Sequence, residues 1–201
     1  LVGETGEKRD KVCRYMAANA LLKELVKESC KPGSDGEKKI CRTIVKLRNG
    51  QSSDVQGLAV KCLPALVRKV HQEGVDEIRV TLGDRVLEGK DEQRDIASIG
   101  LKTVVLEMPS PAASALGAVR QLTHKLVSGV RKESLEIKLE CLDILNDLLK
   151  RFGAVLREDE SKEGLSALFH ELGSARAAAR KRAIACIASI SAGLSDKQLG
   201  V

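Results

Sequence analysis

The side chains of this chain that could do chemistry are six cysteines and three histidines. Zinc binding or disulfide pairing needs such residues in clusters, for example a CxxC pair, and no such pair occurs. A thiol nucleophile would be Cys13 or Cys141, with His71, His124 or His170 as its base, but the spacing supports none of these pairs. Cysteines in helices are more often packed than reactive. We therefore expect no metal, no cofactor and no covalent catalysis.

Other catalytic patterns are missing as well. The sequence contains no GxxxxGK[ST] or GxGxxG phosphate loop, no GxSxG nucleophile turn and no HExxH helix. The carboxylate pairs Glu158/Asp159 and Glu136/Glu140 lie in charge-rich helical segments, where nearby lysines and arginines are their expected partners. The sequence therefore predicts a protein that is not an enzyme and has no small-molecule substrate.

One basic run is the densest charge feature of the chain, and it comprises Arg176, Arg180, Lys181 and Arg182. Its favoured interpretation is the exposed flank of a helix whose buried side holds Ala183, Ile184, Ile187 and Ile190. Contact with an acidic protein surface is the next alternative, and a nuclear import signal or phosphate contacts come after it.

Five helical segments of the chain share one apolar pattern, and these segments must position the residues described above. In each segment we call the first residue of the pattern the anchor, and apolar residues follow it four and seven positions later. The anchors are Ala18, Ala59, Ala97, Lys138 and Ala183. Three positions after the anchor, Cys62, Cys141 and Cys186 share one column, which indicates helix packing. The spacing of about 40 residues between anchors is typical of HEAT and armadillo repeats, whose helix pairs must stack on their neighbours.

The apolar spacing predicts helices and no strands. The expected ranges are 10–27, 36–47, 54–70, 75–87, 91–106, 112–130, 133–152, 160–172 and 174–194, with a kink at Pro64. They form one half-repeat, four helix pairs and a further start after Ser195. We expect an all-α HEAT-repeat solenoid: a single array of about five repeats over residues 1–201, truncated at both ends.

Composition fits such an array. The hydrophobic fraction of 43% with 31% charged residues is ordinary for a globular protein, and only one tyrosine and two phenylalanines are present. Nucleic-acid platforms that stack bases need aromatic faces, so no nucleic-acid partner is expected despite the net charge of +6. No signal peptide and no apolar run of about 20 residues is visible, which predicts no membrane partner. Reduced thiols indicate the cytosol or the nucleus.

The repeat also predicts where a partner binds. Two columns hold most of the polar residues opposite the apolar face: the preceding column, two residues before the anchor, and the following column, five residues after it. We predict that these columns line the inner surface of the stack and recognise a partner by charge complementarity. The predicted partner-binding residues are Lys23, Asp95, Lys102, Glu136, Asp143 and Lys181.

Several stretches resemble the N-terminal HEAT repeats of the Cand family, the cullin-associated, neddylation-dissociated proteins. The similarity runs in register over nearly the whole chain. It is most specific in LAVKCL at 58–63 and RDIASIGLKT at 94–103, and RYMAANALLKEL at 14–25 belongs to the same match.

The resemblance implies a non-catalytic scaffold that binds an unmodified cullin together with its RING subunit. The N-terminal part of such proteins covers the cullin lysine that receives the ubiquitin-like modifier, which blocks cullin neddylation. The whole protein exchanges substrate receptors and so regulates the assembly of SCF and other cullin–RING ubiquitin ligases. The implied location is the cytoplasm and the nucleus.

Two alternatives remain open on the sequence. The same repeats could serve another HEAT adaptor, such as a transport receptor or a phosphatase scaffold fragment. A nucleic-acid-binding solenoid would use the basic run and would lose affinity steeply with salt.

Overall fold

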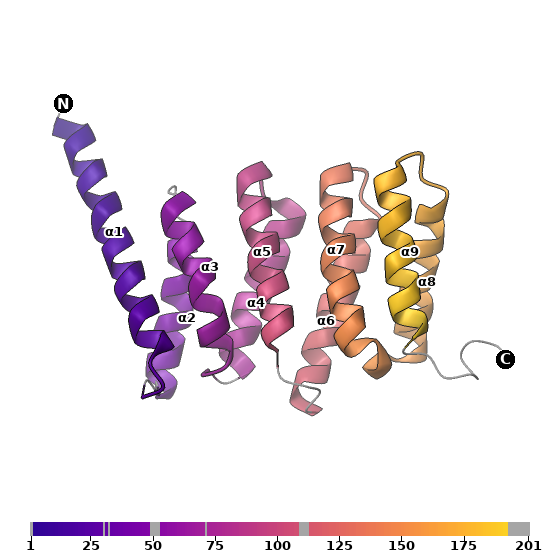
Figure 1. Ribbon diagram of the computed structural model, residues 1–201, viewed down its shortest axis with the longest axis horizontal. Helices are drawn as coiled ribbons and strands as arrows, with labels where there is room; N and C mark the ends of the chain where they lie inside the picture. The colour runs from indigo at the N-terminus through magenta and orange to yellow at the C-terminus, as the bar shows by residue number, and fades with distance from the viewer. Residues whose placement is uncertain are drawn as a thin grey trace. The chain divides into compact units, whose positions relative to one another are not determined.

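The computed structural model describes residues 2–29, 31, 33–48, 53–70, 72–108 and 113–192. Its regular secondary structure within these residues is entirely helical (Figure 1). The elements are α1 (Val2–Val26), α2 (Ser34–Arg48), α3 (Ser53–Val67), α4 (Gln72–Glu88), α5 (Asp91–Glu107), α6 (Ala113–Val130), α7 (Leu135–Phe152), the short 3-10 helix η1 (Gly153–Val155), α8 (Glu158–Leu172) and α9 (Ala177–Ser191). The all-α solenoid class is thereby confirmed.

Helices α1, α3, α5, α7 and α9 contain the five anchors, and we call them the repeat helices; α2, α4, α6 and α8 are the companion helices. The predicted half-repeat followed by four helix pairs matches this order. Helix α1 begins at Val2 instead of residue 10, because its first turns have a helical backbone without the apolar periodicity that the prediction used. Helix α3 runs through Pro64 and ends at Val67, and the kink at this proline stays a prediction.

Two compact units divide the chain inside α4: unit 1 is Leu1–Thr81 and unit 2 is Leu82–Val201. The single array over residues 1–201 therefore stays a prediction, as does its truncation. The predicted connection at residues 109–111 and the helix start after Ser195 lie outside the described residues.

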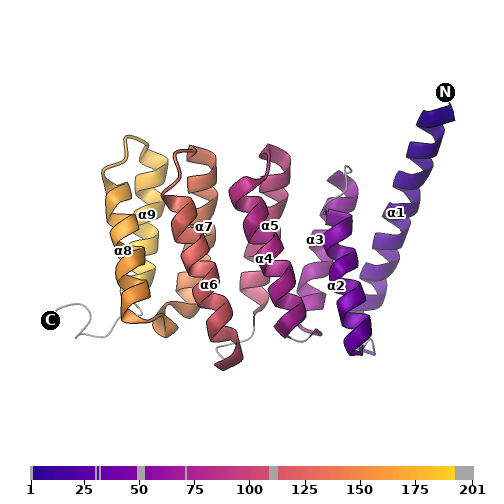
Figure 2. The ribbon, with the colours of Figure 1, turned by 180° about the vertical axis from the view of Figure 1, so that it is seen from behind.

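In unit 1, α1 packs against α3, and α2 pairs with α3 on the side that Figure 2 turns to the viewer. The anchors Ala18 and Ala59 are fully buried between these helices. The first half of α4 approaches α2 at Gly74, where a Cβ would come within 2.9 Å of Cys41 Sγ. The side chain of Lys69 donates a hydrogen bond to the Lys27 carbonyl and joins the last turns of α1 and α3.

In unit 2, α5, α7 and α9 pack in succession, while α6 pairs with α7 and α8 pairs with α9 (Figure 1). Gly129 permits close packing of α6 on α7, since a Cβ there would overlap Cys141 Sγ and lie 2.6 Å from Leu87. Helix α7 begins after Ser134, whose hydroxyl accepts a hydrogen bond from the Ile137 N–H.

The predicted apolar columns are buried in both units except at Leu22 of α1 and Ile187 of α9, which are half-buried. Leu63 and Leu66 of α3 and Leu142 and Leu145 of α7 are at most 1% exposed, and full burial of one such side chain contributes about 1.5–3 kcal/mol. The cysteine column is buried too, as predicted: Cys62, Cys141 and Cys186 are inaccessible.

The one polar anchor, Lys138, is partly buried, with 17% of its side chain exposed, and pairs with Glu171 of α8. Its ammonium lies 2.7 Å from a Glu171 oxygen, and the Glu171 side chain is only 3% exposed. A partly buried charge at an apolar column is tolerated because its counter-charge is buried beside it.

Three apolar residues lie differently from the prediction. Ile184 is 58% exposed instead of buried, because the buried stripe of α9 follows Ala179, Ala183, Cys186 and Ile190, and Ile184 lies beside that stripe. Val12 and Met16 of α1 are likewise exposed, since Ala18 and Leu25 define the buried side of that helix.

Candidate partner-binding surface

The six predicted partner-binding residues fall on the repeat helices, Lys23 in unit 1 and the other five in unit 2. Those of the preceding column are exposed: Asp95 on α5, Glu136 on α7 and Lys181 on α9. In the following column, Lys23 is exposed, whereas the side chains of Lys102 and Asp143 retain only 29% and 35% of their accessible surface. The structure thus separates accessible charges from partly buried ones.

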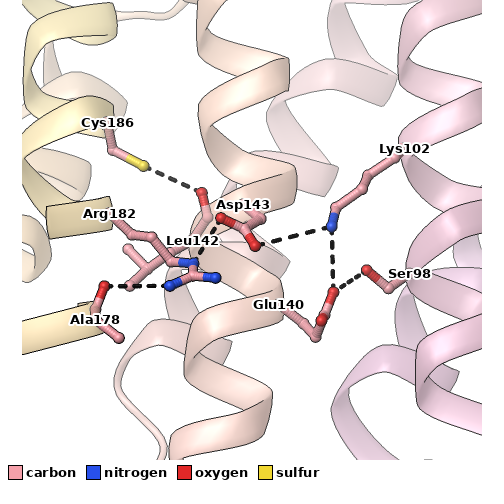
Figure 3. Close-up of polar contacts among 8 residues, drawn as sticks. All are labelled: Ser98, Lys102, Glu140, Leu142, Asp143, Ala178, Arg182 and Cys186. Carbon is pink, nitrogen blue, oxygen red and sulfur yellow. Dashed lines mark hydrogen bonds and ion pairs between the residues drawn. The ribbon is translucent and has the colours of Figure 1, made fainter. Parts of the chain in front are cut away.

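The partly buried charges of unit 2 form a charged ladder of Lys102, Glu140, Asp143 and Arg182 (Figure 3). The Lys102 ammonium lies 3.4 Å from Glu140 and 4.0 Å from Asp143, which joins α5 to α7. The guanidinium of Arg182 donates to Asp143 at 2.8 Å and joins α7 to α9. These pairs hold neighbouring repeat helices in register, since each side chain has a partner on the next helix.

Hydrogen bonds from uncharged donors accompany the ladder (Figure 3). The Ser98 hydroxyl of α5 donates to Glu140, and the Cys186 thiol of α9 donates to the Leu142 carbonyl at 3.2 Å. The carboxylate Glu140 therefore accepts from two α5 side chains, Ser98 and Lys102. It is occupied within unit 2 and offers less to an external partner than an exposed carboxylate does.

A second contact between α5 and α7 involves a buried arginine. Arg94 is 8% exposed, and its guanidinium donates to Glu136 at 3.1 Å and to the Gly89 carbonyl at 2.9 Å. Glu136 is nevertheless 74% exposed, so its carboxylate remains accessible beside this bond. Among the described residues, Asp95 and Lys181 have no hydrogen bond or ion pair of their side chains. Asp95, Glu136 and Lys181 are the predicted residues of unit 2 that a partner can reach.

Sequence reasoning missed Arg94, Glu140 and Arg182 as ladder or bridging residues. The prediction treated Glu136 and Glu140 as surface carboxylates with partners nearby along the helix. Their partners instead come from α5, and only Glu158 has a partner of the expected kind, Lys162, at 2.7 Å. A comparison of opposite charges at matching positions of successive repeats could have found these pairs.

The basic run on α9 divides in the same way. Arg176 and Lys181 are exposed, as predicted for a helix flank, while Arg180 and Arg182 are half-buried. Arg180 donates to the Ser174 carbonyl at 2.7 Å, and Arg182 belongs to the ladder. Two of the four cations therefore stabilise the unit itself.

Burial weakens the acidity of four cysteine thiols, those of Cys41, Cys62, Cys141 and Cys186. Burial raises the pKa of Cys62 and Cys41 to about 11, and the pKa of Cys141 and Cys186 to about 12, with neighbouring carboxylates adding to the shift at every site except Cys62. A raised pKa keeps these thiols protonated at neutral pH, which lowers their nucleophilicity. Cys13 is exposed.

A pocket of about 480 Å³ lies in unit 2 between the turn after α6 and the second half of α8. Its charged lining is largely paired: Arg131 lies 3.1 Å from Glu163, and Lys138 lies 2.7 Å from Glu171. The pocket contains no thiol, and His170 on its rim stands exposed. These residues provide no nucleophile–base pair.

The described part of the chain contains no group of three or more histidine, cysteine or acidic side chains arranged to hold a metal ion. Likewise, none of its helices combines the length and the apolar character required to cross a bilayer.

Comparison with known proteins places these surfaces in a family context. No protein-family model matches the chain. The cullin-associated NEDD8-dissociated protein 1 of Arabidopsis thaliana is 40% identical over 194 residues, which cover 95% of this chain and 16% of that protein. The protein of the same name from Drosophila melanogaster is 43% identical over 179 residues, which cover 89% of this chain and 14% of the relative.

A further relative from Emericella nidulans is named as the N-terminal part of the same protein; it is 25% identical over 191 residues, covering 81% of this chain and 56% of the relative. The chain thus spans about one sixth of the length of the Arabidopsis relative. An engineered protein of known crystal structure is similar with a TM-score of 0.50 at 18% identity, covering 76% of this chain and 63% of that one, and this likeness concerns the fold alone.

Proposed function

Because this chain belongs to the Cand family of cullin-associated, NEDD8-dissociated proteins, we propose that it is a non-catalytic scaffold segment that binds an unmodified cullin together with its RING subunit. The observation that carries the proposal is 40% identity over 95% of the chain to a relative named for cullin association. No observation favours a transport receptor or a phosphatase scaffold instead.

The repeat helices supply the binding surface in this proposal. In unit 2 a partner can reach the accessible charges Asp95, Glu136 and Lys181, and unit 1 offers the accessible charge Lys23. A protein interface of standard size buries about 1,600 Å², so tight binding needs no pocket. Because the accessible charges are of both signs, electrostatic complementarity sets specificity and association rate more than affinity. Lys102 and Asp143 contribute indirectly, since they hold α5, α7 and α9 in register.

The regulatory consequence follows from occupancy. A scaffold that covers the modifier-accepting lysine of the cullin blocks neddylation, and its removal permits a new substrate receptor to be assembled. We assign to this chain the cullin–RING contact, and to the whole protein the exchange of receptors on cullin–RING ubiquitin ligases. We propose the cytoplasm and the nucleus as its location, and neither nucleic acid, membrane nor small molecule as a partner.

A pull-down tests the proposal. The immobilised chain is incubated with a purified cullin–RING complex, either unmodified or carrying NEDD8 on the cullin. Capture of the unmodified complex alone is expected, because the modifier occupies the contacted region. Equal capture of both forms would contradict the neddylation block, and capture of neither would contradict the cullin–RING partner.

A further inference from the structure

Exposed cations gather on the repeat helices of unit 1. We call them the basic face: Lys23 on α1, Lys27 and Lys31 in the segment after α1, Lys61 on α3 and Arg68 just after α3. All five are exposed. The acidic residues of α1 and α3 whose side chains the structure describes all have partners: Asp10 pairs with Arg14, Glu24 with Lys27 at 2.6 Å and Asp54 with Lys11 at 3.4 Å. Glu28 lies in the turn after α1.

The basic face is continuous across two helices. Lys23 of α1 and Lys27 just after it are four residues apart, and Lys61 of α3 and Arg68 just after it are seven residues apart. These spacings place each pair along one side of its helix and its end. Helices α1 and α3 pack against each other, and the bond from Lys69 to the Lys27 carbonyl joins their ends. Figure 1 shows both helices on the side of unit 1 away from α2.

Two of these cations, Lys23 and Lys61, occupy repeat positions that hold ion pairs in unit 2. Relative to the anchors, Lys23 corresponds to Lys102 and Asp143, and Lys61 corresponds to Glu140. In unit 2 charges of opposite sign attract one another across helices at these positions, whereas in unit 1 the same positions hold charges of one sign. The arrangement therefore opposes folding slightly, since like charges repel one another.

The helix dipole does not account for the basic face as a whole. Lys23 lies in the last turn of α1, where a cation is favourable. Lys61, by contrast, lies in the middle of α3, where the dipole has no effect. Within the described residues, the side chains of Lys23, Lys31 and Lys61 have no hydrogen bond or ion pair. The described part of the chain therefore supplies no counter-charge to these three lysines.

We propose that the basic face of unit 1 docks an acidic polypeptide segment that carries an apolar residue beside its carboxylates. Met16 lies seven residues before Lys23 on the same side of α1 and is 64% exposed. An apolar side chain of a polypeptide can cover Met16, whereas a sugar–phosphate backbone cannot. Nucleic acid is also disfavoured by the scarcity of aromatic residues and by Glu24 and Glu28 between the lysines. The inference rests on the proposed function in placing a protein partner on the repeat helices, and it adds the chemistry of that partner.

Fluorescence anisotropy with a labelled synthetic peptide tests the proposal. The probe is a glutamate-rich peptide of about 16 residues with one leucine, and a thymidine oligonucleotide of equal charge is the comparison. The variant is Lys23→Glu with Lys61→Glu. The matched control, Lys38→Glu with Lys39→Glu, makes the same charge change at exposed positions of α2. Circular dichroism establishes that both variants keep their helicity.

The wild-type chain is expected to bind the peptide more tightly than the oligonucleotide, and with strong salt dependence. The basic-face variant should lose at least about tenfold in affinity, and the α2 control less than about twofold. Equal losses in both variants, tighter binding of the oligonucleotide, or no binding of the peptide would overturn the proposal. Because the test uses no cullin, its failure is distinguishable from failure of the cullin–RING capture.

Discussion

Units 1 and 2 share one repeat pattern but use its polar positions differently. Unit 1 contains 16 basic and 11 acidic residues, whereas unit 2 contains 18 basic and 17 acidic ones, so unit 1 holds nearly all of the net charge. In unit 2 the charged ladder pairs opposite charges between α5, α7 and α9. In unit 1 two of the corresponding positions, Lys23 of α1 and Lys61 of α3, are basic and exposed. The same repeat position thus holds an ion pair between helices in unit 2 and an exposed lysine in unit 1.

The largest expected effect tests what the units share, their leucine columns. Leu66→Ala in unit 1 and Leu142→Ala in unit 2 should each lower the free energy of unfolding by about 2–5 kcal/mol, because both side chains are fully buried. Urea denaturation measures the loss. A loss under about 1 kcal/mol in only one of the two variants would contradict the claim that both units bury the same leucine column.

Substitutions in the anchor column should have a smaller effect on stability, because they add volume to the core instead of removing it. Ala59→Leu and Ala183→Leu add volume where each alanine is fully buried, and each should cost about 1–3 kcal/mol through overpacking. Thermal unfolding checks both substitutions. A neutral result at either site would mean that its anchor does not contact the neighbouring helix.

Alkaline pH tests the cysteine column that spans both units. The folded protein keeps the proton of Cys186 up to about pH 12, whereas an unfolded chain releases it near the ordinary value of 9.0. Since the unfolded state then binds fewer protons, stability is independent of this thiol below pH 9 and falls above it, by at most about 1.4 kcal/mol per pH unit. Denaturation at several pH values should show a shallower decline in Cys186→Ala than in the wild type. Identical slopes would contradict the shift.

Removing one charge of the ladder should have the smallest effect on stability, and it tests the difference between paired and accessible charges. Asp143→Ala should destabilise the protein by about 0.2–1 kcal/mol, because it removes a partner from Lys102 and Arg182 in a half-exposed setting. Asp95→Ala, the matched control on α5, should change stability by less than that. Denaturation curves of both variants at low and high salt measure the two losses of stability. A larger loss for Asp95→Ala than for Asp143→Ala would contradict the distinction between a paired Asp143 and an accessible Asp95.

The sequence could predict the helices and their buried faces because apolar periodicity is a local property of the chain. Eight helices begin within three residues of their predicted starts, and the anchor and cysteine columns lie where the pattern indicated. The exposure of Ile184 was missed, since an isoleucine beside a buried stripe looks the same in sequence as one within it.

The polar surface was less predictable. Ion pairs such as Arg182–Asp143 join residues about forty positions apart, and a pattern read within one helix cannot register them. The two predicted polar columns contain accessible residues such as Asp95 and Lys181. They also contain Lys102 and Asp143, whose charges form an ion pair with each other. Whether a partner touches the accessible residues is a prediction that only binding measurements test.

The most direct test of the central claim is the affinity of the chain for an unmodified cullin–RING complex after charge reversal in the preceding column. The variant Asp95→Lys with Lys181→Glu leaves the net charge and the charged ladder intact, and Asp159→Lys with Lys162→Glu on α8 is its matched control. The account predicts a loss of at least about tenfold for the first variant and little change for the second. Unchanged binding in the first variant would show that the repeat helices of unit 2 do not recognise the partner through these charges.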